Sequence, residues 1–284
     1  MNSGTLYLVA TPIGNLDDIT VRALETLKSV NVVAAEDTRH TRKLLSFYDI
    51  HVPLLSFREH NKVYQGQKLI ERLKNGENIA MCSDAGMPLI SDPGESFVRL
   101  CIENDVKVTV IPGANAALTG LVMSGFSANT FLYVGFIPRK KGKQMEFLRT
   151  IEHEPHTLIF YESPNRVADL LESILEVMGN RNVCVIRELT KLHEEAIRGT
   201  VSETLAIVKE RNPNGEFTIV LEGKPIEEDT EPDYIPAEVI LAEVRLYISE
   251  GMEKNKAFKR AASKFKTSKR AVYQMWVEDK ESAE

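Results

Sequence analysis

The sequence has few of the residues that several functional classes need. It contains three cysteines among 284 residues, Cys82, Cys101 and Cys184, and no Cys-x-x-Cys pair. Isolated cysteines in odd number and apolar surroundings argue against a disulfide framework or a zinc site, and indicate buried, reduced thiols. No stretch approaches the roughly 20 apolar residues of a membrane helix, and no basic segment followed by an apolar one opens the chain. We therefore expect a cytoplasmic protein with no membrane contact and no metal.

An excess of positive charge is also missing. Lysine and arginine number 35 against 41 aspartates and glutamates, which gives 35 − 41 = −6. The whole chain therefore does not attract a polyanion, and any nucleic-acid surface must be local. The motifs GxGxxG, GxxxxGK[ST], HExxH and GxSxG do not occur either. Dinucleotide-binding, P-loop, zinc-hydrolase and serine-hydrolase functions thus lose support.

What the sequence does contain fits a folded α/β protein. Hydrophobic residues make up 43% and charged residues 27% of the chain, as in globular proteins. Short β-branched runs alternate with helical patterns, which is typical of strand-helix-strand units around a mostly parallel sheet. We predict two α/β domains, 1–124 and 125–225. The expected strands are 5–10, 30–35, 78–82 and 107–111, then 130–136, 157–161, 183–187 and 217–221.

A third unit is expected at 235–284, after the acidic segment 227–233, which is typical of a linker. Three apolar faces indicate three short helices, with Thr267 or Ser268 capping the last, and resemble a helix-turn-helix unit. Residues 254–270 carry eight basic side chains and no acid. This stretch fits either a phosphate-contacting surface or a solvated lysine-rich tail. The candidates for nucleic-acid binding here are Lys259, Arg260, Lys269 and Arg270.

Loops that follow the first strands carry glycine or helix-starting residues, and ligands of open α/β sheets bind at this edge. Asp84 stands at the tip of an apolar strand, where it either binds a ligand or forms a turn. Asp92, Pro93 and Glu95 match the N-cap, N1 and N3 positions of a helix. We therefore interpret Asp92 as structural.

Five segments in this order closely resemble the tetrapyrrole methylase superfamily: 6–16, 35–39, 83–88, 110–113 and 160–164. They are most similar to its branch that methylates the ribose 2′-oxygen of a decoding-site cytidine in small-subunit ribosomal RNA. The similarity spans about residues 4–223. It implies a homodimer in which each subunit holds S-adenosylmethionine in a cleft between two α/β domains. It also implies small-subunit rRNA, free or in the 30S particle, as the partner. The terminal helices are similar to an appendage of the bacterial members.

The resemblance also implies which residues bind the cofactor. These are Ala10, Pro12, Asp84, Met87, Asn115, Ala116, Tyr161, Glu162, Thr190, Phe217 and Thr218. A strand-end carboxylate and the free backbone groups of glycine loops suit a ligand with a sulfonium cation, an adenine and a zwitterionic tail. The loop 11–14, Thr-Pro-Ile-Gly, departs from the Gly-x-Gly-Pro-Gly-like loop of the sister branch that methylates porphyrin precursors. This departure argues against a tetrapyrrole substrate.

A ribose hydroxyl is a poor nucleophile, so its methylation calls for a base, or for a cation that stabilises the alkoxide. The candidates are Glu36, Asp37 and Lys191, besides Glu59 and His60. Each has a structural alternative, because Glu36 and Asp37 can cap the next helix and Lys191 can lie in solvent. Phosphate contacts in the α/β part are expected from Arg39, Arg42, Lys43, His60, Arg139, Lys140 and Lys141.

We thus expect an S-adenosylmethionine-dependent 2′-O-methyltransferase that acts on a cytidine of 16S ribosomal RNA. Two alternatives stay open at this point. One is a methyltransferase of the same fold that acts on a tetrapyrrole precursor. The other is a non-enzymatic nucleic-acid-binding regulator led by the helix-turn-helix unit.

Overall fold

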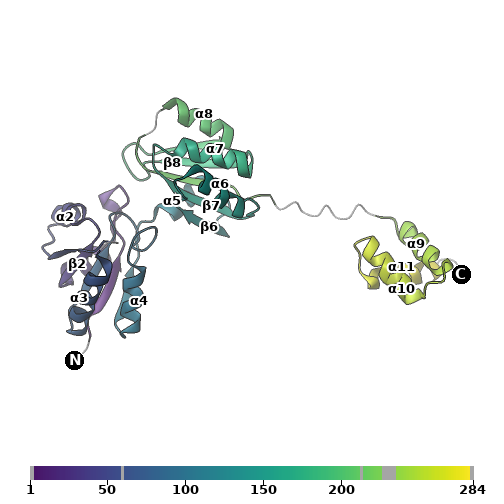
Figure 1. Ribbon diagram of the computed structural model, residues 1–284, viewed down its shortest axis with the longest axis horizontal. Coiled ribbons are helices and arrows are strands. Elements are labelled where there is room, and N and C mark those ends of the chain that lie inside the picture. The colour runs from purple at the N-terminus through teal and green to yellow at the C-terminus, as the bar shows by residue number, and fades with distance from the viewer. Residues whose placement is uncertain (1–2, 59–60, 212–213, 226–234, 282–284) are drawn as a thin grey trace. The chain divides into compact units, whose positions relative to one another are not determined.

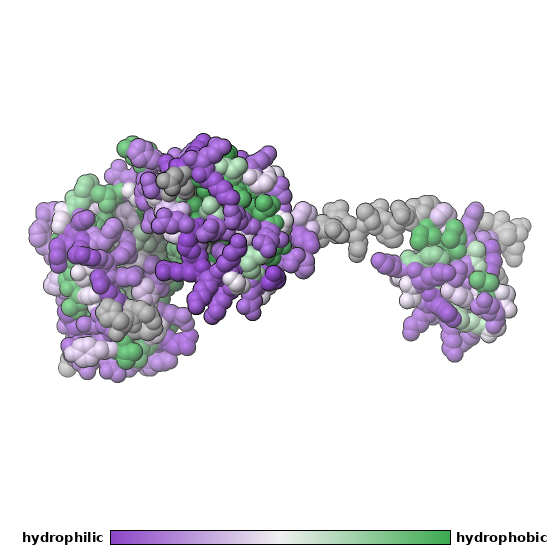
Figure 2. Space-filling model, turned by 45° about the horizontal axis from the view of Figure 1, so that its top comes forward, coloured by the Kyte–Doolittle hydropathy of each residue, from purple (hydrophilic) through white to green (hydrophobic). Residues whose placement is uncertain are grey.

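The computed structural model describes residues 3–58, 61–211, 214–225 and 235–281 (Figure 1). The chain forms two compact units, Met1–Lys224 and Pro225–Glu284. The predicted linker 227–233 and the candidates Glu59 and His60 lie outside the described residues. On the face shown in Figure 2, hydrophilic side chains cover most of each unit.

The first unit begins with a parallel sheet of five strands, in the order β3 (Leu54–Ser56), β2 (Val32–Ala35), β4 (Ile79–Cys82), β1 (Thr5–Val9) and β5 (Lys107–Ile111). All residues of β2 and β4 are buried, as in a sheet that is covered on both faces. Helices α3 (Lys62–Lys74) and α4 (Glu95–Glu103) pack on one face. Helices α1 (Val21–Ser29) and α2 (Thr38–Phe47) pack on the other face of the sheet. The short 3-10 helix η1 (Leu16–Asp18) precedes α1 in the chain.

The second sheet of this unit is mixed, in the order β6 (Phe131–Gly135), β7 (Thr157–Glu162), β10 (Phe217–Leu221), β8 (Asn182–Arg187) and β9 (Glu195–Thr200). Only β6 and β7 run parallel, and the other pairs are antiparallel. The mostly parallel sheet expected from the alternation of the first series is confirmed, whereas the second sheet is mostly antiparallel. No helix separates β8 from β9, and such a short connection permits only antiparallel pairing.

Helices cover both faces of the second sheet. The helices α6 (Lys141–Thr150), α7 (Val167–Met178) and α8 (Val201–Arg211) share a core with one face. Helix α5 (Ala116–Ser124) packs on the other face through Ala117 and Leu121, although it precedes the predicted boundary at 124. The division at 124 stays a prediction. Cys82, Cys101 and Cys184 are buried and unpaired, as the sequence predicted.

The second unit consists of α9 (Ala237–Ser249), α10 (Lys254–Lys264) and α11 (Lys269–Glu281), the three helices that the apolar faces predicted. Val244, Phe258 and Val272 form the centre of its own core. Ser268 Oγ accepts a hydrogen bond from the Ala271 backbone N–H at 3.0 Å, which confirms Ser268 as the cap of α11. In the described part of the chain, no helix is long and apolar enough to span a membrane.

Candidate active site

A cavity of about 370 Å³ lies in the first unit, where the loops after β4, β5 and β7 meet β10. It is lined by eight of the eleven residues that the sequence assigned to the cofactor: Asp84, Met87, Asn115, Ala116, Tyr161, Glu162, Phe217 and Thr218. These residues are up to 134 positions apart in the chain, from 84 to 218. The structure thus brings most of the predicted set to one place.

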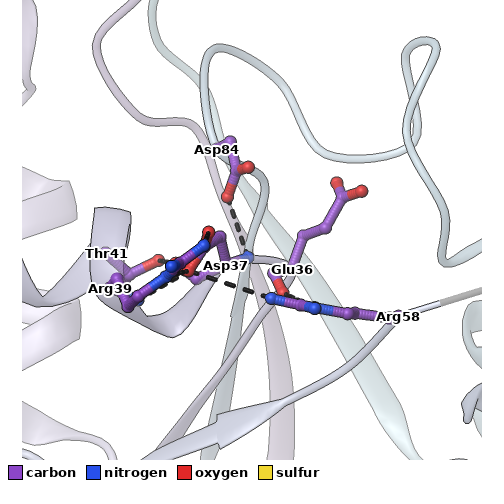
Figure 3. A network of polar contacts seen from close by, with 6 residues as sticks. All are labelled: Glu36, Asp37, Arg39, Thr41, Arg58 and Asp84. Atoms are coloured by element: carbon purple, nitrogen blue, oxygen red, sulfur yellow. Dashed lines mark hydrogen bonds and ion pairs between the residues drawn. The ribbon is translucent and has the colours of Figure 1, made fainter.

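Asp84 is held at the tip of β4 by two local features. Its Oδ1 accepts a hydrogen bond from the Asp37 backbone N–H at 2.9 Å, which ties the ends of β2 and β4 together (Figure 3). Two residues later the chain pairs with the first loop, because Thr11 and Gly86 exchange backbone hydrogen bonds of 2.9 and 3.0 Å. Gly86 has a φ of +77°, a conformation that favours glycine. The Asp84 carboxylate therefore has a fixed position at the cavity wall.

Two aromatic residues of the cavity wall, Phe136 and Tyr161, form a cluster with Tyr133. The ring of Tyr161 lies 5.4 Å from that of Tyr133 and 5.6 Å from that of Phe136, each edge-on. Ser91 and the Tyr133 hydroxyl share a hydrogen bond of 2.6 Å, and burial raises the pKa of Tyr161. Such a cluster offers flat apolar surface to a planar ring.

Glu162 places a buried charge beside this cluster. The residue is 2% exposed, and its Oε1 accepts a hydrogen bond from the Ser163 backbone N–H at 2.8 Å. Its Oε2 lies 3.2 Å from the Arg166 guanidinium and, among the described residues, makes no hydrogen bond. The ion pair with Arg166 compensates this buried charge, and Oε2 can still accept a hydrogen bond.

The other three predicted cofactor residues do not line the cavity. Ala10 is buried and extends β1, since its N–H donates to the Ile111 carbonyl at 3.1 Å. Pro12 is half-buried and follows the paired Thr11. Thr190 has a φ of +65° and packs against the first loop, where a Cβ on Gly14 would lie 2.8 Å from its Oγ1. These residues support the loops that surround the cavity.

Two of the three catalytic candidates have partners that keep them from acting as bases. Asp37 caps α2 and pairs with Arg39 at 2.7 Å, and these contacts hold the pKa of its carboxyl far below the usual range. Lys191 lies 2.8 Å from Glu188 and 3.0 Å from Glu216, which raise the pKa of its ammonium despite burial. Both groups therefore stay charged at neutral pH.

Glu36 differs from these two. Burial, and then the charge of Asp84, raise the pKa of its carboxyl. Figure 3 shows its side chain directed away from the network that joins Asp37, Arg39 and Arg58. Arg58 binds the Glu36 backbone carbonyl at 2.8 Å rather than its carboxylate.

The cationic candidates lie on exposed surface. Arg39, Arg42 and Lys43 are on α2, and the group Arg139, Lys140 and Lys141 leads into α6. In the second unit, Lys259 and Arg260 are on α10, and Lys269 and Arg270 open α11.

The interpretation of Asp92 as a helix cap is wrong. Helix α4 begins at Glu95, and its N-cap is Gly94, with a φ of +136°. A Cβ at Gly94 would lie 2.3 Å from Met81 Cε, so the chain turns there on a glycine and leaves Asp92 in the preceding loop. Asp92 lines the cavity instead, and burial followed by the charge of Glu36 raises the pKa of its carboxyl to about 6. Sequence reasoning missed it, as it missed Phe136 and Glu216 in the same wall.

The sequence model of the tetrapyrrole (corrin/porphyrin) methylase family matches residues 5–205 of this chain. The chain belongs to this family. A relative from Bacillus subtilis named "Ribosomal RNA small subunit methyltransferase I" is 46% identical over 271 residues, 95% of this chain and 93% of the relative. One of the same name from Synechocystis is 41% identical over 276 residues, 97% of this chain and 98% of the relative. The family resemblance of the sequence motifs is thereby confirmed.

Solved structures show the same fold at low identity. A uroporphyrin-III C-methyltransferase from Thermus thermophilus, complexed with S-adenosyl homocysteine, has a TM-score of 0.56 at 19% identity and covers 78% of this chain and 98% of its own. A diphthine synthase has a TM-score of 0.59 at 14% identity and covers 77% and 90%. The predicted fold class is therefore confirmed.

Proposed function

We propose that this chain is an S-adenosylmethionine-dependent methyltransferase that methylates the ribose 2′-oxygen of a cytidine in the decoding region of 16S ribosomal RNA. The observation that carries the proposal is identity of 41–46% over at least 95% of the chain to proteins named for small-subunit ribosomal RNA methylation. The sequence of the first loop supports an RNA substrate over a tetrapyrrole, because Thr11–Gly14 lacks the glycine-rich pattern of the porphyrin branch.

The cavity has the chemistry that the cofactor requires. Asp84 offers a fixed carboxylate for the polar end of the donor, and Tyr161 with Phe136 offers apolar surface for its adenine. Glu162 has an oxygen that lacks a hydrogen bond in the described chain, as a site that a ligand completes would have. When bound, the donor supplies an electrophilic methyl group. The chain's own contribution is to hold the acceptor oxygen in line with that methyl and to exclude water, an effect worth about 7–11 kcal/mol at its best.

The RNA partner calls for a local cationic surface on a chain of net charge −6. We assign this role to the exposed cations of α2, of the segment before α6 and of the helical unit. Proteins read single-stranded RNA mostly through splayed nucleotides and the 2′-hydroxyl, which suits a reaction at a ribose oxygen. The proposal includes a homodimer, an RNA substrate that is free or assembled in the 30S particle, and a cytoplasmic location.

The test is methyl transfer from labelled donor to 16S RNA and to 30S particles from cells that lack this protein. We expect transfer to one cytidine, and nucleoside mass mapping should place the methyl group on the ribose. Transfer to uroporphyrinogen instead of RNA would support the tetrapyrrole alternative. RNA binding without any transfer, lost on deletion of residues 235–284, would support the regulator.

A further inference from the structure

Asp37 holds two arginine side chains just after β2 (Figure 3). Its Oδ1 accepts a hydrogen bond from Arg39 Nε at 3.1 Å, and its Oδ2 accepts one from Arg39 Nη2 at 2.7 Å. This two-point contact fixes the plane of the Arg39 guanidinium. Arg58 approaches the same carboxylate, with its Nη2 3.9 Å from Oδ1, while its Nε donates to the Glu36 carbonyl at 2.8 Å. Both guanidinium groups therefore have a fixed place beside one carboxylate.

One hydrogen bond joins this arrangement to the wall of the proposed donor cavity. The Asp37 backbone N–H donates to Asp84 Oδ1 at 2.9 Å, and Asp84 lines the cavity. Arg39 and Arg58 do not line the cavity themselves. The two arginines thus lie next to the donor site but outside it, where a substrate much larger than the donor continues.

Both guanidinium groups keep donors for a ligand. The side chains of Arg39 and Arg58 are 81% and 42% exposed. Within the described residues, the Nη1 nitrogen of each makes no hydrogen bond, so each side chain still has free N–H groups. Figure 3 shows the Glu36 side chain directed away from them, so its carboxylate does not take up these donors.

The charge of the two arginines suits an anion. One carboxylate faces two guanidinium groups, and the hydrogen bonds from Arg39 hold the pKa of Asp37 well below its usual range. Asp37 is therefore ionised at neutral pH and neutralises one of the two positive charges. Asp84 belongs to the cavity wall, where the proposed donor brings a positive charge of its own. Planar guanidinium groups match the geometry of phosphate, which they bind through two parallel N–H groups.

We propose that Arg39 and Arg58 form a clamp for an RNA phosphate that flanks the acceptor ribose, and that Asp37 positions the two arginines. The inference rests on the proposed function and narrows its cationic surface to two side chains. Each ribose of RNA is linked to phosphates through its 3′- and 5′-oxygens, so a 2′-hydroxyl that reaches the donor brings a phosphate to the cavity mouth. Holding this phosphate orients the ribose, and a misplacement of about 1 Å can lower a rate about 10²-fold.

The experiment measures methyl transfer in a single turnover with saturating donor and saturating 16S RNA or 30S particles, and RNA affinity separately. Arg39→Lys and Arg58→Lys keep the charge but remove the planar fork, so we expect each to lower the rate by about 10-fold to 10²-fold. Donor affinity, measured by calorimetry, should stay within about twofold of wild type, because the clamp acts on RNA.

Asp37→Asn separates orientation from simple attraction. The change removes a negative charge and keeps a residue type that caps helices. RNA affinity should therefore stay the same or increase. The rate at saturation should nevertheless fall by about 10-fold, because the arginines lose the carboxylate that orients them. A surface that only attracts RNA predicts no such loss.

Arg99 and Glu95 provide the matched control. They form an exposed ion pair of 3.0 Å near the start of α4, and neither lines the donor cavity. Arg99→Lys and Glu95→Gln repeat the two kinds of substitution away from the clamp. Both should leave the rate and the RNA affinity within about twofold of wild type.

Several outcomes would overturn the clamp. Rates within about twofold of wild type in both lysine variants would show that charge alone suffices. An undiminished rate in Asp37→Asn would remove Asp37 as the positioning residue. A loss of donor affinity in the lysine variants would mean that the arginines bind the carboxylate of the donor instead of RNA. Circular dichroism melting checks each fold, and if Asp37→Asn does not fold, the lysine variants decide. A wild-type chain that transfers no methyl group to ribose overturns the proposed function and the clamp with it, whereas the variants test the clamp alone.

Discussion

The cations of the helical unit allow a quantitative test of RNA binding. Of the eight basic residues in 254–270, three have partners: Lys264 pairs with Glu243, and Lys254 and Arg260 lie over aromatic rings. The other five make no ion pair or ring contact in the described part of the chain, and all are exposed: Lys256, Lys259, Lys266, Lys269 and Arg270. If the unit binds RNA, these five are the side chains available to phosphate.

The expected effect follows from counterion release. Each phosphate contact to a single strand adds about 0.7 to the slope of log K against log salt concentration. Replacing Lys259, Lys269 and Arg270 by glutamine should therefore make the slope shallower by about 2. Between about 50 and 200 mM salt, the affinity of the triple variant for RNA should therefore fall roughly 20-fold less than that of the wild-type chain.

Fluorescence anisotropy with a decoding-region RNA fragment, repeated over a salt series, measures this slope. The control replaces Lys28, Lys107 and Arg149 by glutamine, because these cations are also exposed and lie in the first unit, outside the sets assigned to RNA. Donor affinity should stay the same in both triple variants. An unchanged slope in the helical-unit variant, or an equal change in the control, would refute the assignment of this surface.

Three further predictions concern the first unit. Asp84→Ala should abolish donor binding in calorimetry while moving the ligand-free melting temperature little, because the lost hydrogen bond to Asp37 is offset by weaker repulsion with Glu36 and Asp92. Gly14→Ala should destabilise the chain by about 1–3 kcal/mol in urea unfolding, since its Cβ would lie 2.5 Å from Lys191 Cγ and 3.0 Å from the Leu189 carbonyl oxygen. Asp92→Asn should stabilise the ligand-free chain by about 1 kcal/mol at pH 8 and not at pH 4. The pKa of the Asp92 carboxyl rises on folding from 3.8 to about 6, so the wild-type chain loses stability as pH rises through that window. Partial exposure of the side chain reduces the size of this effect.

A specific result would contradict each of these three predictions. Undiminished donor affinity in Asp84→Ala would remove its carboxylate from the site. Gly142 has open space around a built Cβ, so Gly142→Ala should be neutral or stabilising, and an equal loss in both glycine variants would show a general effect rather than a clash. Equal stability differences for Asp92→Asn at pH 4 and pH 8 would mean that burial does not shift its titration.

Local patterns predicted the six interior strands of the described chain and two of its four edge strands, β5 and β6. The eight strands expected from β-branched runs all formed, but β3 and β9 had no such signal. β3 has three half-buried residues at one edge of its sheet, and β9 has none that is fully buried. An edge strand is stabilised by one neighbour only and gains little from burial, so its sequence carries less hydrophobic periodicity. The order of the second sheet was unpredictable for a similar reason, since no run of residues encodes which strands become neighbours.

The site shows where local reasoning fails. Asp92, Pro93 and Glu95 have the residue types of a helix start, yet the helix starts two residues later than that pattern predicts. Tertiary contacts determine where this helix begins. Leu89 and Ser91 adopt left-handed conformations that their own propensities oppose, and Tyr133 from the second sheet holds Ser91 in place. Tertiary contacts outweigh a capping preference of about 1 kcal/mol. Most of the residues that the resemblance assigned to the cofactor line one cavity, because the motifs fix whole loops rather than single caps.

Two carboxylates with different partners, Asp84 and Asp92, lie eight residues apart in the segment after β4. Asp84 accepts a hydrogen bond from a backbone N–H, and Asp92 accepts one from the Ser83 side chain. Both residues line the same cavity, where burial raises the pKa of the Asp92 carboxyl and the nearby charge of Asp84 adds to this rise. A cation bound in this cavity favours the ionised form of Asp92, and by linkage the ionised carboxylate favours binding of the cation. Two carboxylates in one wall therefore suit the sulfonium donor of the proposed function.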